Sequence, residues 1–457
     1  MLNDQGAMLF VITYYVDNEK TSAKFSARHL INTTACLNCV PIQNRVNLMK
    51  QWRATAAAVL AIIASASGAL GEDKVDVEVL HSWTSASESA AMRVLVDAIN
   101  SSGGKWVDAA VSAGTREQAA TNRIVGGNPP TTFMTSFGTV KSLSGQHLLR
   151  NVDQVAEKEK WRDVLPAEIV KWNAGDGHFY AVQTTIQSLN MMYYSREVLA
   201  KSGIKEIPTT WDGLFGMFDK VRAAGFIPLA QSGTPSFELN LFGTVLASVD
   251  GGKVYRQILA EKKSDAVHSA EFAKAVTIFR RLKSYTDAGA EGRNWNDTTA
   301  LVVTNRAAMQ FIGEYGRGEY VAAGKNSQTD YGCNVGLDNS VVVLGGDIFA
   351  FPETKDPKAM AAQDLVATTF LSKEVQTQFA VKRGSMPART DLDPSKFDTC
   401  VQVGYKLAKQ PENVVLSPYV YLDPQTLGEL RDLITELWSN DTLEPQDFID
   451  EFAAKFE

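Results

Sequence analysis

The chain has 457 residues, of which 45% are hydrophobic, and a formal net charge of −7. It is longer than the size at which a single hydrophobic core stops growing, so we expect two folded domains. The acidic balance argues against nucleic acid and anionic membranes as partners, because both attract basic surfaces.

A secretory signal peptide is predicted inside the chain rather than at its first residue. Residues 49–53 (MKQWR) are basic, residues 54–66 are small and apolar almost throughout, and small residues continue at 67–71 before a polar run begins at Glu72. This is the order of a signal peptide and its cleavage site. The apolar run of 13 residues is shorter than the roughly 20 that a transmembrane helix needs, and a buried alanine-rich helix is the alternative. We therefore expect residues 49–71 to be a signal peptide and the working protein to be exported.

The segment ahead of this signal, residues 1–48, is expected to be a non-native extension, with translation starting at Met49, because export machinery reads a signal at the N-terminus. It contains a C-x-x-C pair at Cys36 and Cys39, which is half of a metal site at most and has no partner motif nearby. Residues 1–71 hold six Lys/Arg and three Asp/Glu, so 386 residues with 39 basic and 49 acidic side chains remain. The exported part therefore has a net charge of −10.

Two cysteines remain beyond the signal, Cys333 and Cys400. Exported compartments are oxidising, so we expect these two residues to form a disulfide, and the alternative is two separate buried thiols. No cysteine follows the cleavage site, so no lipid anchor is expected there. A freely diffusing periplasmic protein fits these features.

The exported part begins with strands that alternate with helices. Residues 75–79 alternate valine with acidic residues, as in a strand, and Ser85-x-x-Glu88 has the spacing of a capping box that opens a helix. A further strand, helix and strand are predicted at 106–111, 116–125 and 131–136. This β-α-β-α-β order implies a largely parallel sheet with helices on its faces.

The same α/β pattern continues downstream and favours a second lobe. Strands are predicted at 189–194, 227–231, 307–312, 341–344 and 349–351, and helices at 211–224, 269–284, 357–381 and 425–456, the last of them broken at Glu444-Pro445.

Sequence motifs of common enzymes are missing. The chain has no G-x-S-x-G, no H-E-x-x-H and no glycine-rich nucleotide loop. No two of the exported histidines share metal-ligand spacing; they are His81, His147, His178 and His268. We expect no cofactor and no enzymatic activity. Two carboxylates acting as a pair leave no motif, so an extracellular glycoside hydrolase stays open as the alternative function.

Aromatic and polar residues gather in loops after predicted strands. Trp83 follows the first strand, beside Thr84, Ser85 and Glu88. Ligands of open α/β sheets bind beyond the carboxyl ends of strands, and a ring next to hydroxyls and a carboxylate suits a polyhydroxylated ligand. The alternative for Trp83 is a core anchor. The same theme recurs at 295–298 (WNDT) and 313–315 (GEY), where the alternative is a capped turn.

Tyr193 and Tyr194 are adjacent, and paired tyrosines ligate iron in some periplasmic ferric-binding proteins. A mid-strand pair points to opposite faces of a sheet, so we expect one of the two rings to pack in the core rather than to bind iron.

Several longer stretches, in the same order, resemble one protein family. They are VEVLHSWTSASE (77–88), RIVGGNPPTTF (123–133), FYAVQTTIQSLNMMYYS (179–195), IPTTWDGL (207–214), PLAQSG (228–233), WNDTTALVVTNRAAMQFIGEYGRGEY (295–320), GGDIFAFP (345–352) and KRGSMPARTD (382–391). The chain resembles the extracellular solute-binding proteins of sugar ABC transporters, family 1, and within them the glucose/mannose-binding branch.

The resemblance implies an α/β, two-lobe periplasmic-binding-protein fold with a hinge and an interlobe ligand cleft. We expect residues 72–183 and 307–352 to form lobe 1, and residues 184–306 and 353–457 to form lobe 2. The implied function is that of a monomer that binds a monosaccharide or a closely related polyhydroxylated ligand and delivers it to the permease subunits of an ABC importer. A protein that feeds a chemosensor instead would bind the same ligand.

The resemblance also implies a set of ligand-binding residues. The positions that match ligand-contacting positions of the family are Trp83, Thr84, Glu88, Trp295, Asp297, Asp347 and Arg383. Positions that depart from the glucose/mannose branch are Ser82, Met134, Ser136, Gln187, Phe237 beside Glu238, and Glu314 with Tyr315; all of these except Ser82 and Met134 join the predicted site. Plain glucose is therefore not expected, and the candidates are another hexose, a glycoside, a sugar alcohol or an amino sugar. Together Glu88, Glu238, Glu314 and Asp347 would form an acidic pocket that favours a cationic or hydroxyl-rich ligand.

Overall fold

The structure is a computed structural model that describes residues 74–173, 176–337, 340–408 and 410–457. The chain divides into two units, Met1–Gly71 and Glu72–Glu457, of which the second is compact. The predicted N-terminal extension, the signal peptide and the C-x-x-C pair all lie outside the described residues. The second unit carries every element described below.

The larger of two sheets mixes parallel and antiparallel strands, in the order β10-β4-β9-β3-β1-β2 with β11 beside β9. The predicted parallel pairing is present where β1 lies between β2 and β3. It ends at β9, which runs antiparallel to both β3 and β4, so the sheet is only partly parallel. The strands are β1 (Val75–His81), β2 (Gly104–Ala110), β3 (Thr132–Thr135), β4 (Ala181–Ser188), β9 (Val342–Ala350), β10 (Met386–Pro387) and β11 (Val414–Leu416).

The smaller sheet has the order β6-β7-β5-β8. Its strands are β5 (Met191–Ser195), β6 (Ile227–Leu229), β7 (Ala307–Ile312) and β8 (Tyr331–Val335). Only residues 189–190 separate β4 from β5, so the chain passes directly from the larger sheet to the smaller one. The next passage between the sheets is the connection from β8 to β9. We call the larger sheet with its helices the first lobe, and the smaller sheet with its helices the second lobe.

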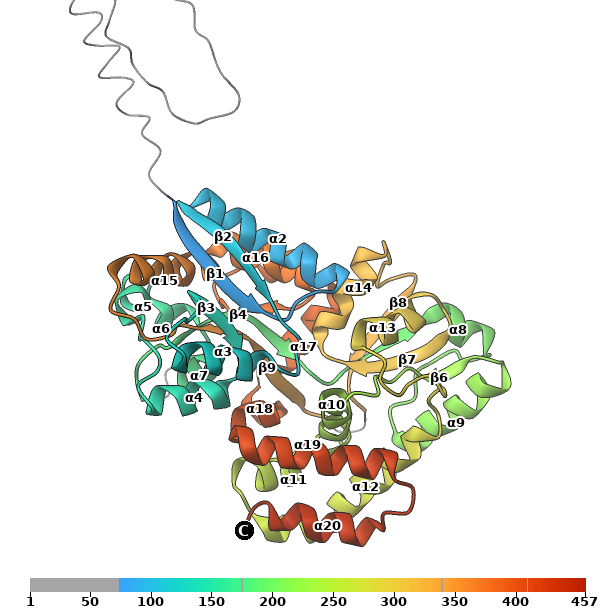
Figure 1. Cartoon of the computed structure of the whole chain (residues 1–457). Coiled ribbons are helices and arrows are strands. Elements are labelled where there is room, and N and C mark those ends of the chain that lie inside the picture. The colour runs from blue at the N-terminus through green and yellow to red at the C-terminus, as the bar shows by residue number, and fades with distance from the viewer. Residues whose placement is uncertain (1–73, 174–175, 338–339, 409) are drawn as a thin grey trace, which may run out of the picture. The chain divides into compact units, whose positions relative to one another are not determined.

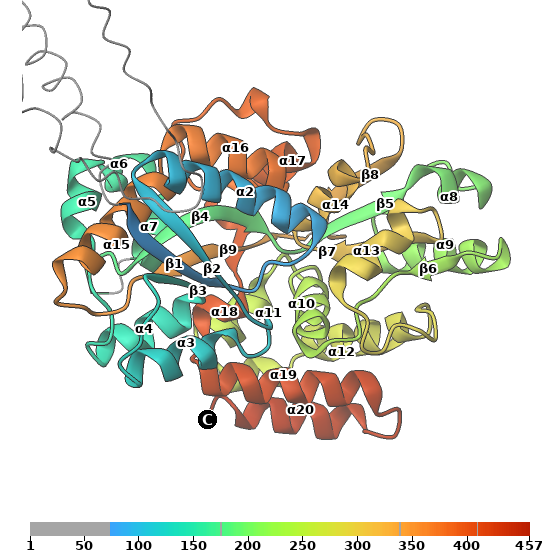
Figure 2. The same ribbon diagram turned by 45° about the horizontal axis from the view of Figure 1, so that its top comes forward.

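Helices cover both sheets (Figures 1 and 2). Those of the first lobe are α2 (Ala86–Ser101), α3 (Arg116–Val125), α4 (Phe137–Gly145), α5 (Asp153–Lys158), α6 (Trp161–Val164), α7 (Ala167–Asn173), α15 (Pro357–Phe370), α16 (Lys373–Arg383) and α18 (Pro418–Tyr421). Those of the second lobe are α8 (Arg196–Lys201), α9 (Trp211–Ala223), α10 (Pro235–Leu246), α11 (Lys253–Tyr255), α12 (Ala270–Lys283), α13 (Trp295–Val303), α14 (Arg317–Ala322), α19 (Pro424–Ser439) and α20 (Pro445–Ala454). Helix α17 (Thr399–Ala408) packs against β8 and β9, one strand from each sheet.

Several predicted elements differ from the observed ones. The two short strands predicted at 341–344 and 349–351 are parts of one strand, β9 (Val342–Ala350), because β4 pairs with it through the glycine pair and Asp347. Gly346 is needed there, since a Cβ atom at this position would collide with the carbonyl oxygen of Thr185. The long helix predicted at 357–381 is broken into α15 and α16, where the Ser372 side chain caps α16.

The lobe boundaries also differ from the predicted ones. Residues 307–352 were expected in one lobe, but β7 and β8 belong to the smaller sheet, whereas β9 belongs to the larger sheet. Helices α15 and α16, expected in the other lobe, pack against β1, β4 and α2 of the larger sheet. The chain therefore crosses between the lobes as many times as predicted, but it returns to the first lobe only at β9 and leaves it again only before α19. Figure 1 shows the C-terminal helices α19 and α20 side by side, next to α10, α11 and α12.

Two hydrophobic clusters form the core. The first contains Val77 and Phe349 of the larger sheet and extends to Tyr193 of the smaller one, and the second contains Phe218 and Phe242. The predicted disulfide is present and joins Cys333 of β8 to Cys400 of α17 across 67 positions of sequence. Among the described helices, none combines the length and the apolar character that crossing a membrane requires.

Candidate functional site

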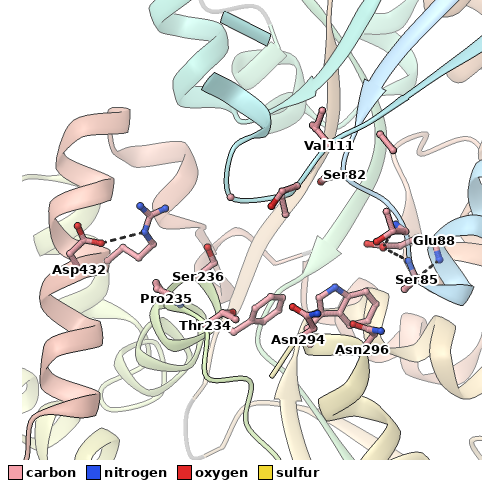
Figure 3. A pocket seen from close by; sticks show the side chains of 18 residues that line it. Ser82, Ser85, Glu88, Val111, Thr234, Pro235, Ser236, Asn294, Asn296 and Asp432 are labelled. Atoms are coloured by element: carbon pink, nitrogen blue, oxygen red, sulfur yellow. Dashed lines mark hydrogen bonds and ion pairs between the residues drawn. The ribbon is translucent and has the colours of Figure 1, made fainter. Parts of the chain in front are cut away.

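A cleft with two connected compartments lies where loops of the first lobe face the second lobe. The inner compartment, of about 350 Å³, borders β4 and β9, and the outer one has about 760 Å³. Figure 3 shows the outer compartment, with Ser82 and Val111 across from Thr234, Pro235 and Ser236. The residues that line both compartments are Ser82, Glu88, Ala113, Gly114, Ser236, Phe237, Trp295 and Arg431.

Most residues of the predicted site line this cleft. The ten that do so are Trp83, Thr84, Glu88, Ser136, Gln187, Phe237, Trp295, Tyr315, Asp347 and Arg383. They come from the loop after β1, the first turn of α2, the residue after β3, the strands β4 and β9, the turn after β7, the last residue of α16 and the first turns of α10 and α13. The fold therefore gathers at one place residues that are up to 300 positions apart in the sequence, from Trp83 to Arg383.

Arg383 lines the inner compartment and is only 3% exposed. Its Nη2 atom lies 3.7 Å from Oε1 of Glu88, and its Nε atom lies 3.7 Å from Oδ2 of Asp347. Its guanidinium carbon is 5.6 Å from the ring centroid of Trp83 and 5.0 Å from that of Tyr315. The buried Nε and Nη1 atoms of Arg383 have no hydrogen-bond acceptor among the described residues. The Nε–H and Nη1–H groups of Arg383, which lies between two carboxylates, therefore remain available as hydrogen-bond donors.

The two carboxylates beside Arg383 each use one oxygen to hold the protein together. Oε2 of Glu88 accepts hydrogen bonds from the backbone N–H groups of Thr84 (2.9 Å) and Ser85 (3.0 Å), which completes the predicted capping box of α2. Oδ2 of Asp347 accepts from Nε2 of Gln187 at 2.5 Å and, on its other side, from a threonine hydroxyl of β4 at 3.2 Å. Oε1 of Glu88 and Oδ1 of Asp347 accept no hydrogen bond from any described residue, so both are available to a ligand.

Aromatic side chains form the walls between the two compartments. Trp295 and Phe237 are half-buried and line both compartments, and the Trp295 ring meets the Tyr315 ring edge to face at a centroid distance of 5.2 Å. Trp83 is only 4% exposed and packs against Phe349 and Phe379. It is therefore a core residue that also borders the inner compartment, and Trp295 is the more accessible ring.

The helices α10 and α13 both begin at the cleft. Their N-cap residues are Thr234 and Asn294, and neither side chain makes the usual capping hydrogen bond. The first N–H groups of a helix need acceptors from outside the helix. The first turn of α13 therefore adds unused backbone donors at the cleft, whereas in α10 Pro235 has no N–H group and Phe237 donates to the carbonyl oxygen of Thr234. Ser136, in contrast, caps α4 by accepting from the backbone N–H of Thr139.

Three residues of the predicted site lie away from both compartments. Glu238 points toward α19 and accepts a hydrogen bond of 2.6 Å from Thr435, and burial raises its pKa. Glu314 is fully buried and accepts from the backbone N–H of Met386, and burial raises its pKa to about 8. Asp297 is exposed on the first turn of α13.

Charged residues that the sequence analysis did not single out also line the cleft. Arg116 donates from Nη1 to the Ser82 hydroxyl at 3.1 Å, and Glu117 accepts from the backbone N–H of Ser136 at 2.9 Å. Arg431 of α19 forms an ion pair with Asp432 at 3.8 Å. The lining therefore holds three arginines and four carboxylates, and the predicted acidic pocket is a cleft of nearly balanced charge. Arg116 and Glu117 could have been suspected because they follow the second strand at its carboxyl end.

Metal-binding features are not found in the described part of the chain. No cluster of three or more His, Cys, Asp or Glu side chains there is arranged to hold a metal ion. Tyr193 is fully buried against Tyr320 and Tyr331, while Tyr194 lies near Arg196 on the other side of β5. The tyrosine pair is thus split between the two faces of its strand, as expected.

Comparison with known proteins places this chain in a family. Residues 95–401 match the family described as bacterial extracellular solute-binding protein. A "Probable sugar-binding periplasmic protein" of Rhizobium meliloti is 34% identical over 357 residues, which cover 77% of this chain and 85% of that protein. A solved "Chitin oligosaccharide binding protein" has a TM-score of 0.74 at 15% identity and covers 84% of this chain and 98% of its own. A solute-binding protein of an ABC transporter from Thermotoga lettingae, bound with α-D-tagatose, has a TM-score of 0.70 at 17% identity and covers 84% and 99% of the two chains. These structures share the two-lobe fold, and the chain belongs to the bacterial extracellular solute-binding protein family.

Proposed function

We propose that this protein binds a monosaccharide or a closely related polyhydroxylated ligand in the cleft and delivers it, in the periplasm, to the permease of an ABC importer. The arrangement around Arg383 carries this proposal. Two unused N–H donors lie between two carboxylates that each keep one free oxygen. A sugar hydroxyl both donates and accepts, so adjacent hydroxyls of one ring can bond to Arg383 and to a neighbouring carboxylate together.

The aromatic residues of the cleft support the same ligand class. Trp295 and Phe237 are half-buried and border both compartments. The faces of such rings are apolar and match the C–H face of a pyranose, while the polar groups select its hydroxyl pattern. The nearly balanced charge of the lining favours a neutral sugar over a cationic amino sugar, because a free cation would face three arginines as well as four carboxylates.

Binding is proposed to favour closure of the two lobes on the ligand. Arg383, Asp347 and Glu88 belong to the first lobe, whereas Trp295 and Phe237 belong to the second. A ligand that touches both sets binds the closed form more tightly than the open form and so shifts the population toward it. The relative from Rhizobium meliloti, which is named a sugar-binding periplasmic protein, supports both the ligand class and the compartment.

Native mass spectrometry of the purified protein against a panel of neutral hexoses, pentoses, sugar alcohols and amino sugars tests the proposal. We expect a one-to-one complex with at least one neutral sugar, and no turnover of glycosides incubated with the protein. Binding of none of these compounds would refute the proposed ligand class. Release of product from a glycoside would instead favour the hydrolase alternative.

A further inference from the structure

The outer compartment extends beyond what one sugar ring at Arg383 occupies. It has about twice the volume of the inner compartment. Its lining includes Phe237 and Trp295 but not Tyr315, Asp347 or Arg383. A ring that is hydrogen-bonded to Arg383 therefore leaves the outer compartment free for a second group of the same ligand.

The outer lining is polar and largely uncharged. Its hydroxyl and amide side chains are those of Thr84, Ser85, Ser112, Thr234, Ser236, Asn294 and Asn296. The Arg431–Asp432 pair, whose side chains are 36% and 77% exposed, is the charged exception beside Glu88. Hydroxyl and amide groups can both donate and accept, which suits a second neutral group that carries hydroxyls better than an alkyl or an ionic substituent. Figure 3 shows Asn294 and Asn296 on the same side of this compartment as Thr234.

Ser82 lies at the junction of the two compartments. It is half-buried and lines both of them, and its hydroxyl accepts a hydrogen bond of 3.1 Å from Arg116. The next residue, Trp83, is fixed in the core by Phe349 and Phe379, so the backbone at Ser82 has little freedom to move aside. A small side chain at this position keeps the passage between the compartments open.

We propose that the ligand has two parts, a hexose held at Arg383 and a second sugar in the outer compartment, and that the small side chain of Ser82 determines whether the second sugar fits. This inference rests on the proposed function and extends it from a single ring to a disaccharide. Ser82 is thus the specificity-determining residue for ligand length.

Isothermal titration calorimetry with hexoses and with disaccharides built from the same hexoses tests this inference. We expect one disaccharide to bind at least about tenfold more tightly than either of its component sugars, and Ser82→Trp to weaken binding of that disaccharide by about tenfold or more.

Three further variants make the test specific. Ser112→Trp adds bulk at a position that lines only the outer compartment, so it should weaken binding of the disaccharide and leave the dissociation constant of the component hexose within about threefold of the wild-type value. It serves as the second test where Ser82→Trp lowers the thermal stability. Ser89→Trp places the same bulk on an exposed position of α2 and should change neither affinity. Ser82→Ala removes the hydroxyl but not the passage and should keep the preference for the disaccharide.

The outcomes separate this inference from the proposed function. Hexoses that bind as tightly as every disaccharide, or a disaccharide preference that survives both Ser82→Trp and Ser112→Trp, would overturn the two-part ligand and leave sugar binding intact. Absence of binding to both panels would overturn the proposed function and this inference with it.

Discussion

Replacing Arg383 with methionine should abolish most of the sugar affinity. Methionine keeps an unbranched stem next to Trp83 and Tyr315 but removes the two donors, Nε and Nη1, that no described residue uses. A hydrogen bond to a charged group contributes about 1.5–3 kcal/mol, so the loss of two such bonds to the ligand costs about 3 kcal/mol or more. Because each 1.4 kcal/mol is about tenfold in affinity, the dissociation constant should rise by about 100-fold or more.

The same replacement also removes the cation between Glu88 and Asp347, each of which lies 3.7 Å from the guanidinium. Leaving two buried carboxylates without it should lower the free energy of unfolding by about 1–3 kcal/mol. Arg383→Lys keeps the charge but not the planar pair of donors, so its affinity should lie between those of the wild type and Arg383→Met.

Arg389→Met is the matched control for this experiment. Arg389 donates from Nε and Nη2 to Asp391 at 2.8 and 2.9 Å, outside the cleft, and this pairing lowers the pKa of Asp391 to about 2. The control should therefore lower stability without changing sugar affinity. Calorimetric titration and thermal unfolding, measured on all variants, separate the two effects. A dissociation constant for Arg383→Met within about threefold of the wild-type value would refute the role of Arg383, as would an equal loss in the control.

Three other predictions address the aromatic wall, a buried acid and the disulfide. Trp295→Ala should weaken sugar binding by about 2 kcal/mol, roughly 30-fold, with little change in melting temperature; titration calorimetry showing unchanged affinity would remove this ring from the site. Burial raises the pKa of Glu314 from 4.5 to about 8 in the folded protein, so the folded state binds this proton more tightly than the unfolded state. The resulting stabilisation is complete below pH 4.5 and is lost as the pH rises to about 8. Measured by urea unfolding across this pH range, the free energy of unfolding of the wild type should fall relative to that of Glu314→Gln by on the order of 1 kcal/mol per pH unit. Free energies of unfolding that change with pH in the same way for both proteins would contradict a buried neutral acid at Glu314. Replacing Cys333 and Cys400 with serine opens a loop that spans 67 positions and should lower the free energy of unfolding by about 2–4 kcal/mol in the same assay; an unchanged value would mean that the bridge does not constrain the unfolded chain.

Features determined by local sequence could be predicted, and those determined by distant segments could not. The capping box at Ser85 and Glu88 is set by a spacing of three residues, and the structure contains it. Strand β4 has the sequence AVQTTIQS, in which every residue is buried, so it shows no apolar alternation along its length. Its buried polar side chains form hydrogen bonds with residues that are distant in the sequence, as Gln187 does with Asp347. The local sequence contains no pattern that predicts such a pair.

The same distinction explains which acids reach the cleft. Glu88 and Glu314 both follow a strand in a segment that contains an aromatic residue, Trp83 in one case and Tyr315 in the other. Glu88 is turned toward the cleft because it caps its own helix, whereas Glu314 is covered by the backbone of Met386, 72 positions later. Arg431 reaches the cleft from the C-terminal helix α19, a placement that depends on how α19 packs against α10. Which residues line the cleft, and how its charges balance, therefore depend on long-range packing.

A crystal structure of the protein with the sugar that binds it most tightly would show whether Arg383 and its neighbouring carboxylates hold the ligand. We expect a sugar ring whose hydroxyl oxygens accept hydrogen bonds from Nε or Nη1 of Arg383. Its hydroxyl groups should donate to Oε1 of Glu88 or Oδ1 of Asp347, with Trp295 against one face of the ring. A sugar bound away from Arg383, with the two N–H groups still unused, would contradict it.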